Sequence, residues 1–104
     1  MLDKTAVREI ALKYTDKVTQ TYQPSQVILF GSYINGTPHE YSDIDIAVVF
    51  NGYKGNWLET WTELFHLREN LSFAIEPHMM DETSDRSGFL EYVKKTGEIL
   101  YEAS

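Results

Sequence analysis

Two aspartates separated by one residue, Asp43 and Asp45, are the residues of this sequence most clearly able to do chemistry. They open an apolar run, residues 43–50, whose composition predicts a β-strand. Successive side chains of a strand alternate faces, so both carboxylates point the same way, about 7 Å apart at Cα. Glu76, in a second apolar run at 73–79, joins them if the two strands are neighbours. Carboxylates grouped in this way repel one another, and a divalent cation such as Mg²⁺ would neutralise them.

A glycine and a serine precede these acids in the chain. Gly31 directly follows residues 27–30, an apolar run that predicts another strand, and Ser32 comes next. Without a Cβ, Gly31 lets backbone N–H groups approach a ligand closely, and Ser32 adds a hydroxyl and its own N–H. These features favour phosphate, but a phosphate beside an acidic pair requires a metal ion between them. The sequence therefore favours a complex of metal ion and nucleotide over a free anion.

Ordinary surface chemistry is the alternative for each of these residues. Asp43 and Asp45 would then be solvated acids on a strand face, and Glu76 a surface carboxylate near Pro77. His78 falls on the same strand face as Glu76. We expect an exposed or hydrogen-bonded histidine there, with a supporting role beside Glu76 as the alternative. The spacing between the glycine–serine pair and the two aspartates makes the metal site the better hypothesis.

The order of these features resembles the signature of a known superfamily. Residues 28–32 (ILFGS), Gly36 and residues 42–48 (SDIDIAV) are similar to the motif of the DNA polymerase β-like nucleotidyltransferases, in particular their minimal members. Glu76 is similar to the third metal-binding acid of that superfamily. The resemblance covers most of the chain, from the first helical segment to the last short strand.

The resemblance implies a role for each of these residues. Gly31 and Ser32 would contact the nucleotide phosphates, Asp43 and Asp45 would hold Mg²⁺, and Glu76 would hold metal and help to activate an acceptor hydroxyl. The implied reaction is Mg²⁺-dependent transfer of a nucleoside monophosphate, with AMP from ATP as the expected case. Small members often pair with a helical HEPN-domain protein. The resemblance therefore implies a type VII-like antitoxin that modifies a hydroxyl of such a partner.

The turn after Gly31 departs from the superfamily pattern. Tyr33 and Asn35 stand where many members carry arginines, and their neutral hydrogen bonds are roughly half as strong as charge-assisted ones. Glu76 is one methylene longer than the aspartate of many relatives. The alternative function is a catalytically degenerate protein that binds its partner without chemistry. A substitute positive charge could come from one of three basic residues: Lys54, Arg68 or Arg86.

The elements that must position these residues follow from hydrophobic periodicity and from glycine and proline punctuation. We predict a single α/β (α+β) domain over 1–104 with the polymerase β-like fold, a small mixed sheet and helices packed on one face. Trp57, Trp61 and Phe65 form an apolar stripe that fits either the core or a homo-oligomer contact. The expected order is helix 3–22, strand 27–30, turn 31–38, strand 43–50, helix 57–71, strand 73–79 ending or lying at an edge by Pro77, helix 87–96 and strand 99–101.

Composition excludes several other classes of function. Sixteen acidic residues against nine basic ones give a formal net charge of -7, which disfavours direct nucleic-acid binding. The absence of cysteine excludes disulfides, thiolate zinc sites and a cysteine nucleophile. The first residues lack the apolar run of a signal peptide, and no stretch reaches the roughly 18 apolar residues of a membrane span. We therefore expect a cytoplasmic protein without a membrane anchor.

Overall fold

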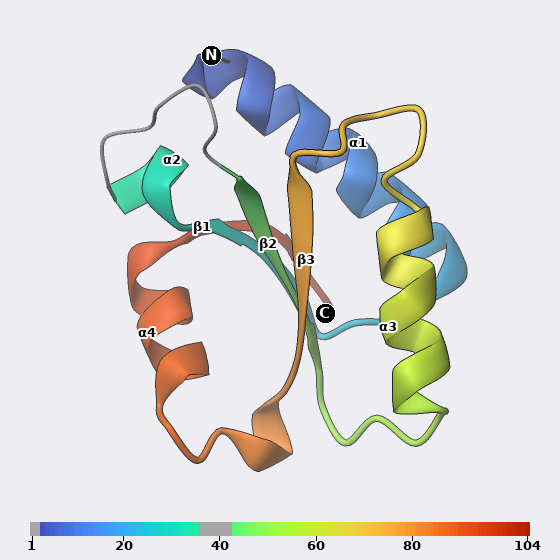
Figure 1. Ribbon diagram of the computed structural model, residues 1–104. Coiled ribbons are helices and arrows are strands. Elements are labelled where there is room, and N and C mark those ends of the chain that lie inside the picture. Colours follow the sequence, from blue (N-terminus) through green and yellow to red (C-terminus); the bar gives the residue numbers. More distant parts are fainter. Residues whose placement is uncertain (1–2, 36–42) are drawn as a thin grey trace.

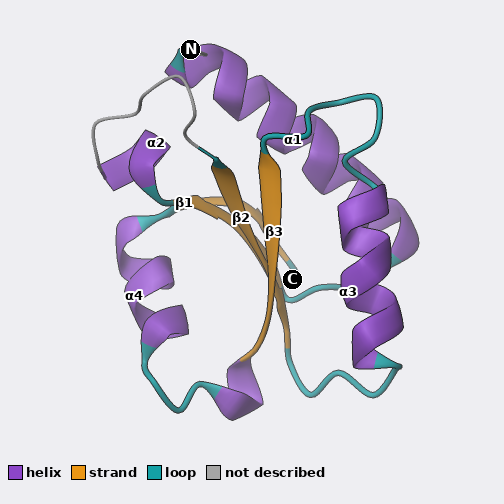
Figure 2. Ribbon diagram, in the orientation of Figure 1, coloured by secondary structure: helices purple, strands orange, loops and turns teal. Residues whose placement is uncertain are grey.

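A computed structural model describes residues 3–35 and 43–104 of the chain. Figures 1 and 2 show a central sheet with helices on either side. The predicted order of helices and strands is confirmed, with shifts of a few residues at most boundaries. The elements are α1 (Lys4–Thr21), β1 (Gln26–Phe30), α2 (Ser32–Asn35), β2 (Ile44–Phe50), α3 (Trp57–His66), β3 (Ile75–Asp81), the 3₁₀ turn η1 (Glu82–Ser84), α4 (Phe89–Thr96) and β4 (Glu98–Glu102).

The four strands form one mixed sheet in the order β3-β2-β1-β4. β1 pairs antiparallel with both β2 and β4, whereas β2 and β3 are parallel. Parallel pairing needs a crossover, and α3 with its flanking loops supplies it. β3 lies at an edge, as expected, because only an edge strand tolerates the missing N–H of Pro77. The mixed α/β class is thus confirmed.

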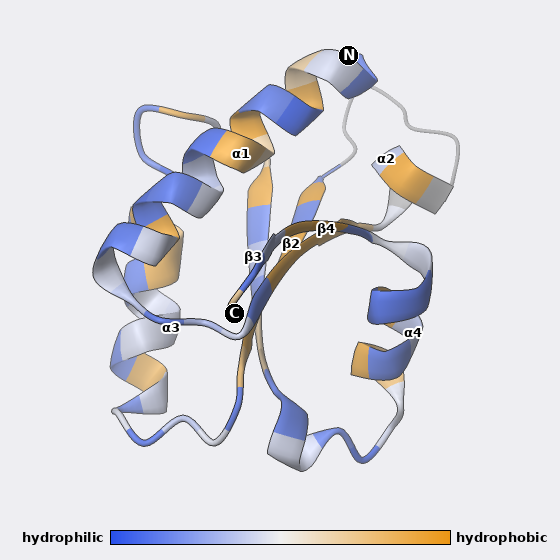
Figure 3. Ribbon diagram, turned by 180° about the vertical axis from the view of Figure 1, so that it is seen from behind, coloured by the Kyte–Doolittle hydropathy of each residue, from blue (hydrophilic) through white to orange (hydrophobic). Residues whose placement is uncertain are grey.

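The helices cover both faces of the sheet, so the prediction that they pack on one face is wrong in this detail. α1 and α3 lie on one side and α4 on the other (Figure 1). The cause is that β2 is apolar on both faces: Ile46 and Val48 belong to the core on the side of α1, and Ala47 and Val49 to a smaller core with Leu90 of α4. A strand buried on both faces needs cover on both sides. Figure 3 shows alternating hydrophobic and hydrophilic bands on the helices, with hydrophobic colour concentrated on the central strands of the sheet.

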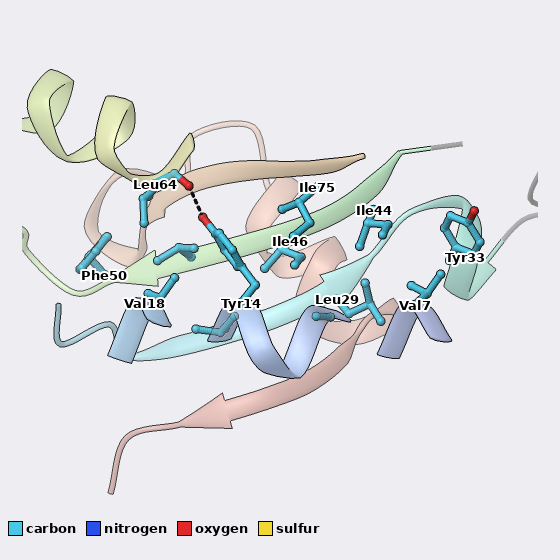
Figure 4. Close-up of a cluster of buried hydrophobic side chains, with 13 residues drawn as sticks. Val7, Tyr14, Val18, Leu29, Tyr33, Ile44, Ile46, Phe50, Leu64 and Ile75 are labelled. Carbon is cyan, nitrogen blue, oxygen red and sulfur yellow. Dashed lines mark hydrogen bonds between the residues drawn. The ribbon is translucent and has the colours of Figure 1, made fainter. Parts of the chain in front are cut away.

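α1 is fixed to the sheet by a stripe of buried residues at helical spacing, as its periodicity predicts. Asp3 caps the helix by accepting a hydrogen bond from the N–H of Ala6 at 2.8 Å. Tyr14, fully buried between α1, β2 and α3, donates its hydroxyl to the Leu64 carbonyl at 2.6 Å (Figure 4). That carbonyl lies in the last turn of α3, where intrahelical partners run out. The buried stripe of α1 consists of Val7, Ala11, Tyr14, Thr15 and Val18.

The aromatic residues of α3 and α4 lie nearer to the surface than a core stripe would. Trp57 and Trp61 are 43% and 42% exposed, and Phe89 is 44% exposed. α3 ends at His66 and not near 71, because the chain turns there towards β3.

Among the helices of residues 3–35 and 43–104, none combines the length and the apolar character that crossing a membrane requires.

Candidate active site

Two of the predicted acids lie side by side on adjacent strands. Asp45 and Glu76 are direct partners in the parallel register of β2 and β3, each at the second position of its strand. Partners in register project to the same face of a sheet. The condition set by the sequence, that these strands be neighbours, is met. Asp43, exposed just before β2, shares a side-chain hydrogen bond with Glu76, so the three acids gather at one end of the sheet.

A histidine completes this cluster. His78 follows Glu76 by two residues on β3, and its Nε2 lies 3.0 Å from Oδ1 of Asp45. Asp45, Glu76 and His78 each offer one ligand atom, and these three atoms lie within 4.8 Å of one another. Sequence reasoning left His78 outside the predicted site. Strand alternation places it on the face of Glu76, but its contact with Asp45 depends on the strand register.

Gly31 lies directly against the Asp45 carboxylate. Phe30, the last residue of β1, pairs with Asp45 of β2. The chain leaves the strand at the next residue, Gly31, whose φ is +88°. A Cβ at Gly31 would lie 2.3 Å from Oδ2 of Asp45, far inside van der Waals contact. Glycine is needed for both the backbone conformation and the space. The turn predicted to bind phosphate is therefore built against the acidic cluster.

Other parts of the predicted motif have a less direct placement. Ser32 opens α2, and its side chain is outside what the structure describes; Gly36 and Ser42 lie outside the described residues altogether. Tyr33 is 2% exposed and belongs to the apolar core beside α1. The idea that Tyr33 replaces an arginine as a phosphate donor is thus wrong, because burial among apolar side chains removes its ring from the solvent-facing site.

The structure gives the positions of two of the basic candidates for a phosphate clamp. Lys54 follows the end of β2 opposite to Asp45. Arg68 donates from Nη1 to the carbonyls of Phe73 and Ile75 at 3.0 and 3.1 Å. Its guanidinium therefore links the segment after α3 to the start of β3 through hydrogen bonds.

The acidic cluster resists full ionisation in the folded chain. The pKa of the Glu76 carboxyl is raised, first by its hydrogen bond with Asp43, then by partial burial and by the Asp43 charge. A raised pKa means that the folded protein disfavours a fully ionised cluster. Carboxylate oxygens are the preferred ligands of Mg²⁺, and the imidazole of His78 is a good ligand for transition metals. The donor set at Asp45 and Glu76 therefore fits a divalent cation.

The acidic cluster is partly exposed to solvent beside α4. Leu90 and Val93 of α4 belong to one apolar cluster with Ala47 and Val49 of β2. Phe89 of α4 packs against Phe30, the register partner of Asp45, with ring centroids 5.8 Å apart. The side chains of Asp45 and His78 are 22% and 32% exposed, so both remain accessible to solvent.

The mixed sheet with its helices on both faces has the fold of a nucleotidyltransferase domain. The chain belongs to the family described as polymerase beta nucleotidyltransferase, whose family model matches residues 13–104. The two aspartates, Glu76 and Gly31 all fall within the matched region.

Known relatives agree with this assignment. A curated protein of Methanocaldococcus jannaschii, named "Putative protein adenylyltransferase MJ1215", is 39% identical over 44 residues, which are 42% of this chain and 51% of that protein. The match thus spans about half the length of the curated relative. A solved structure from Sulfolobus solfataricus, described as "a putative nucleotidyltransferase", shares the fold with a TM-score of 0.71 and 21% identity, covering 95% of this chain and 83% of that one.

Two further solved structures come from toxin–antitoxin systems. One is a mutant of the toxin–antitoxin MntA-HpeT, with a TM-score of 0.55, and the other a toxin–antitoxin with AMP-PNP, with a TM-score of 0.56. Each is 21% identical and covers 99% of this chain and 76% of that one. At this identity the likeness shows a common fold.

Proposed function

We propose that this protein is a Mg²⁺-dependent nucleotidyltransferase that transfers AMP from ATP to a hydroxyl of a partner protein. The observation that carries the proposal is the contact of three features at one end of the sheet. Asp45 and Glu76 are register partners, and Gly31 leaves space for the Asp45 carboxylate that any Cβ would fill. A turn able to bind phosphate and a donor set able to bind a cation thus meet at one point.

The roles of the residues follow from this arrangement. Asp43, Asp45 and Glu76 would hold Mg²⁺. The bound ion would neutralise the charge of the triphosphate and the charge that develops on the attacking and leaving oxygens. The backbone at Gly31 and Ser32 would hold and orient the phosphates for in-line attack. In the transfer, the acceptor oxygen forms a bond to the α-phosphorus, the bond to pyrophosphate breaks, and the acceptor proton leaves towards the acidic cluster.

The nucleotide and the acceptor are inferred from the relatives. A protein named as an adenylyltransferase favours AMP as the transferred group, and the toxin–antitoxin structure with AMP-PNP favours a nucleotide in this fold. We propose that the acceptor is a helical HEPN-type toxin, which would make this chain a type VII-like antitoxin. Cytoplasmic location belongs to the same proposal, because ATP and such a toxin meet there.

The test is label transfer from α-labelled ATP with MgCl₂ to the protein encoded beside this chain's gene. We expect the neighbour to become labelled by the parent chain and not by Asp45→Asn. Asp16→Asn is the matched control, because Asp16 is an exposed aspartate on α1 outside the site. Labelling that survives Asp45→Asn would contradict the metal-site assignment.

A non-catalytic binding module is the second candidate, favoured by the burial of Tyr33 in place of an exposed arginine. This alternative predicts that the chain neutralises its partner without labelling it. It also predicts that Asp45→Asn neutralises the partner as well as the parent does. The same labelling experiment, with partner toxicity measured in parallel, separates the two functions.

A further inference from the structure

We propose that His78 is a direct ligand of the bound cation, so that the site binds a first-row transition-metal ion such as Mn²⁺ more tightly than Mg²⁺. The proposal rests on the metal site of the proposed function and goes beyond it, because it assigns a nitrogen ligand and a metal preference. The superfamily resemblance supplied only the three acids. The histidine comes from the structure.

The distances among the three ligand atoms suit one small cation. Metal–ligand bonds of about 2.1 Å in octahedral geometry place neighbouring ligand atoms roughly 3.0 Å apart and opposite ones roughly 4.2 Å apart. Nε2 of His78 and Oδ1 of Asp45 are 3.0 Å apart, and the full set with Glu76 lies within 4.8 Å. The cluster needs to contract only slightly to surround an ion.

The imidazole is also held in place by its surroundings. His78 pairs in register with Ala47 of β2, whose small side chain leaves room on the shared face. The Phe30 ring meets the imidazole edge-on, with centroids 5.0 Å apart, and Phe89 meets Phe30 at 5.8 Å. His78 keeps 32% of its side chain exposed, so the ring is packed but accessible to an ion from solvent.

The donor types set the metal preference. Mg²⁺ takes oxygen ligands and gives up its waters reluctantly, whereas imidazole binds transition metals well. An imidazole added to the carboxylates of the site therefore favours Mn²⁺ over Mg²⁺. The competing explanation is that His78 only positions Asp45 by donating a hydrogen bond from Nε2 to its carboxylate, without touching the metal.

The experiment measures binding of Mn²⁺ alone and of Mg²⁺ alone to the 104-residue chain by calorimetry, and records pulsed EPR of the bound Mn²⁺ for nitrogen coupling. The variant is His78→Gln, and His66→Gln is the matched control, because His66 is an exposed histidine at the end of α3. We expect His78→Gln to weaken Mn²⁺ binding about 10-fold or more and Mg²⁺ binding less than about 3-fold. The nitrogen coupling should disappear in His78→Gln and persist in His66→Gln.

The possible results separate this proposal from the proposed function. Bound Mn²⁺ without nitrogen coupling in the parent chain, or equal weakening of both ions by His78→Gln, would overturn direct ligation and leave the acidic metal site intact. If Asp45→Asn binds both ions as well as the parent does, the metal site itself fails. Circular dichroism checks the fold of each variant, and His78→Asn replaces His78→Gln if the latter does not fold.

Discussion

Replacing Gly31 with alanine tests the link between the turn and the acidic cluster. The new Cβ would lie 2.3 Å from Oδ2, 3.1 Å from Cγ and 3.2 Å from Cβ of Asp45, so the aspartate side chain must move. Moving it breaks the 3.0 Å contact between Asp45 and His78. The substitution also forces a residue with a side chain to adopt φ +88°. One methyl group thus perturbs the backbone and the site together.

The two effects have separable magnitudes. An alanine in the left-handed region costs about 1–2 kcal/mol. The smaller entropy of the unfolded chain offsets about 0.4–1 kcal/mol of this. Displacing Asp45 and losing its hydrogen bond with His78 adds about 1–2 kcal/mol at this partly buried position. We expect Gly31→Ala to lower the free energy of unfolding by about 2–3 kcal/mol in total.

Gly52→Ala is the matched control. Gly52 has φ +73° and no atom within 4 Å of its would-be Cβ, so this variant carries the backbone strain without the clash. Urea unfolding followed by tryptophan fluorescence gives the two stabilities, and calorimetry gives divalent-cation affinity. Gly31→Ala should be the less stable variant by about 1–2 kcal/mol and should lose about 100-fold in label transfer, because the Asp45 carboxylate is displaced. Equal stability of the two variants, with unchanged cation affinity, would refute the proposed contact.

Three further predictions concern the hydrogen bonds and charges of the fold. Tyr14→Phe leaves the buried Leu64 carbonyl without its partner and should lower the free energy of unfolding by about 1–3 kcal/mol, measured by urea titration. The pKa of Asp81 lies below its usual value, first because the Thr83 hydroxyl donates to it, so its stabilisation is present above about pH 4 and is lost as pH falls. Asp81→Asn should therefore be less stable at pH 7 and show a shallower loss of stability in acid. The raised pKa of Glu76 has the opposite sign, since its stabilisation is present at low pH and is lost as pH rises. Glu76→Gln should therefore gain a few tenths of a kcal/mol at pH 7 with EDTA and lose that advantage with divalent cation, as thermal melts would show.

Much of the fold was predictable because its elements have strong local signals. The buried stripe on α1 follows from the helical spacing of its apolar residues. The turn after β1 follows from the glycine at position 31. The two-sided cover of the sheet was also encoded, since the unbroken apolar run 46–50 is typical of a strand buried on both faces. We predicted helices on one face only. Asp45 is the one position of β2 that is not buried.

The remaining features depend on contacts between segments distant in the sequence. His78 reaches Asp45 only because β2 and β3 align with Asp45 opposite Glu76, and no local pattern sets that register. Tyr33 lies in a turn predicted to bind phosphate, but a ring of its size gains more from burial against α1 than from exposure. Tertiary packing decided both positions.

The site lies at the one position of β2 that is not buried. The residues of β2 beyond Asp45 are buried on both faces of the sheet, whereas the side chain of Asp45 is 22% exposed. There the folded chain brings Asp43 and Glu76 together and raises the pKa of Glu76, an arrangement that opposes folding at neutral pH. In the proposed function, a bound cation would compensate for this repulsion and would also reverse the sign of the local field. That is how a chain with net charge -7 would hold a triphosphate beside its acidic cluster.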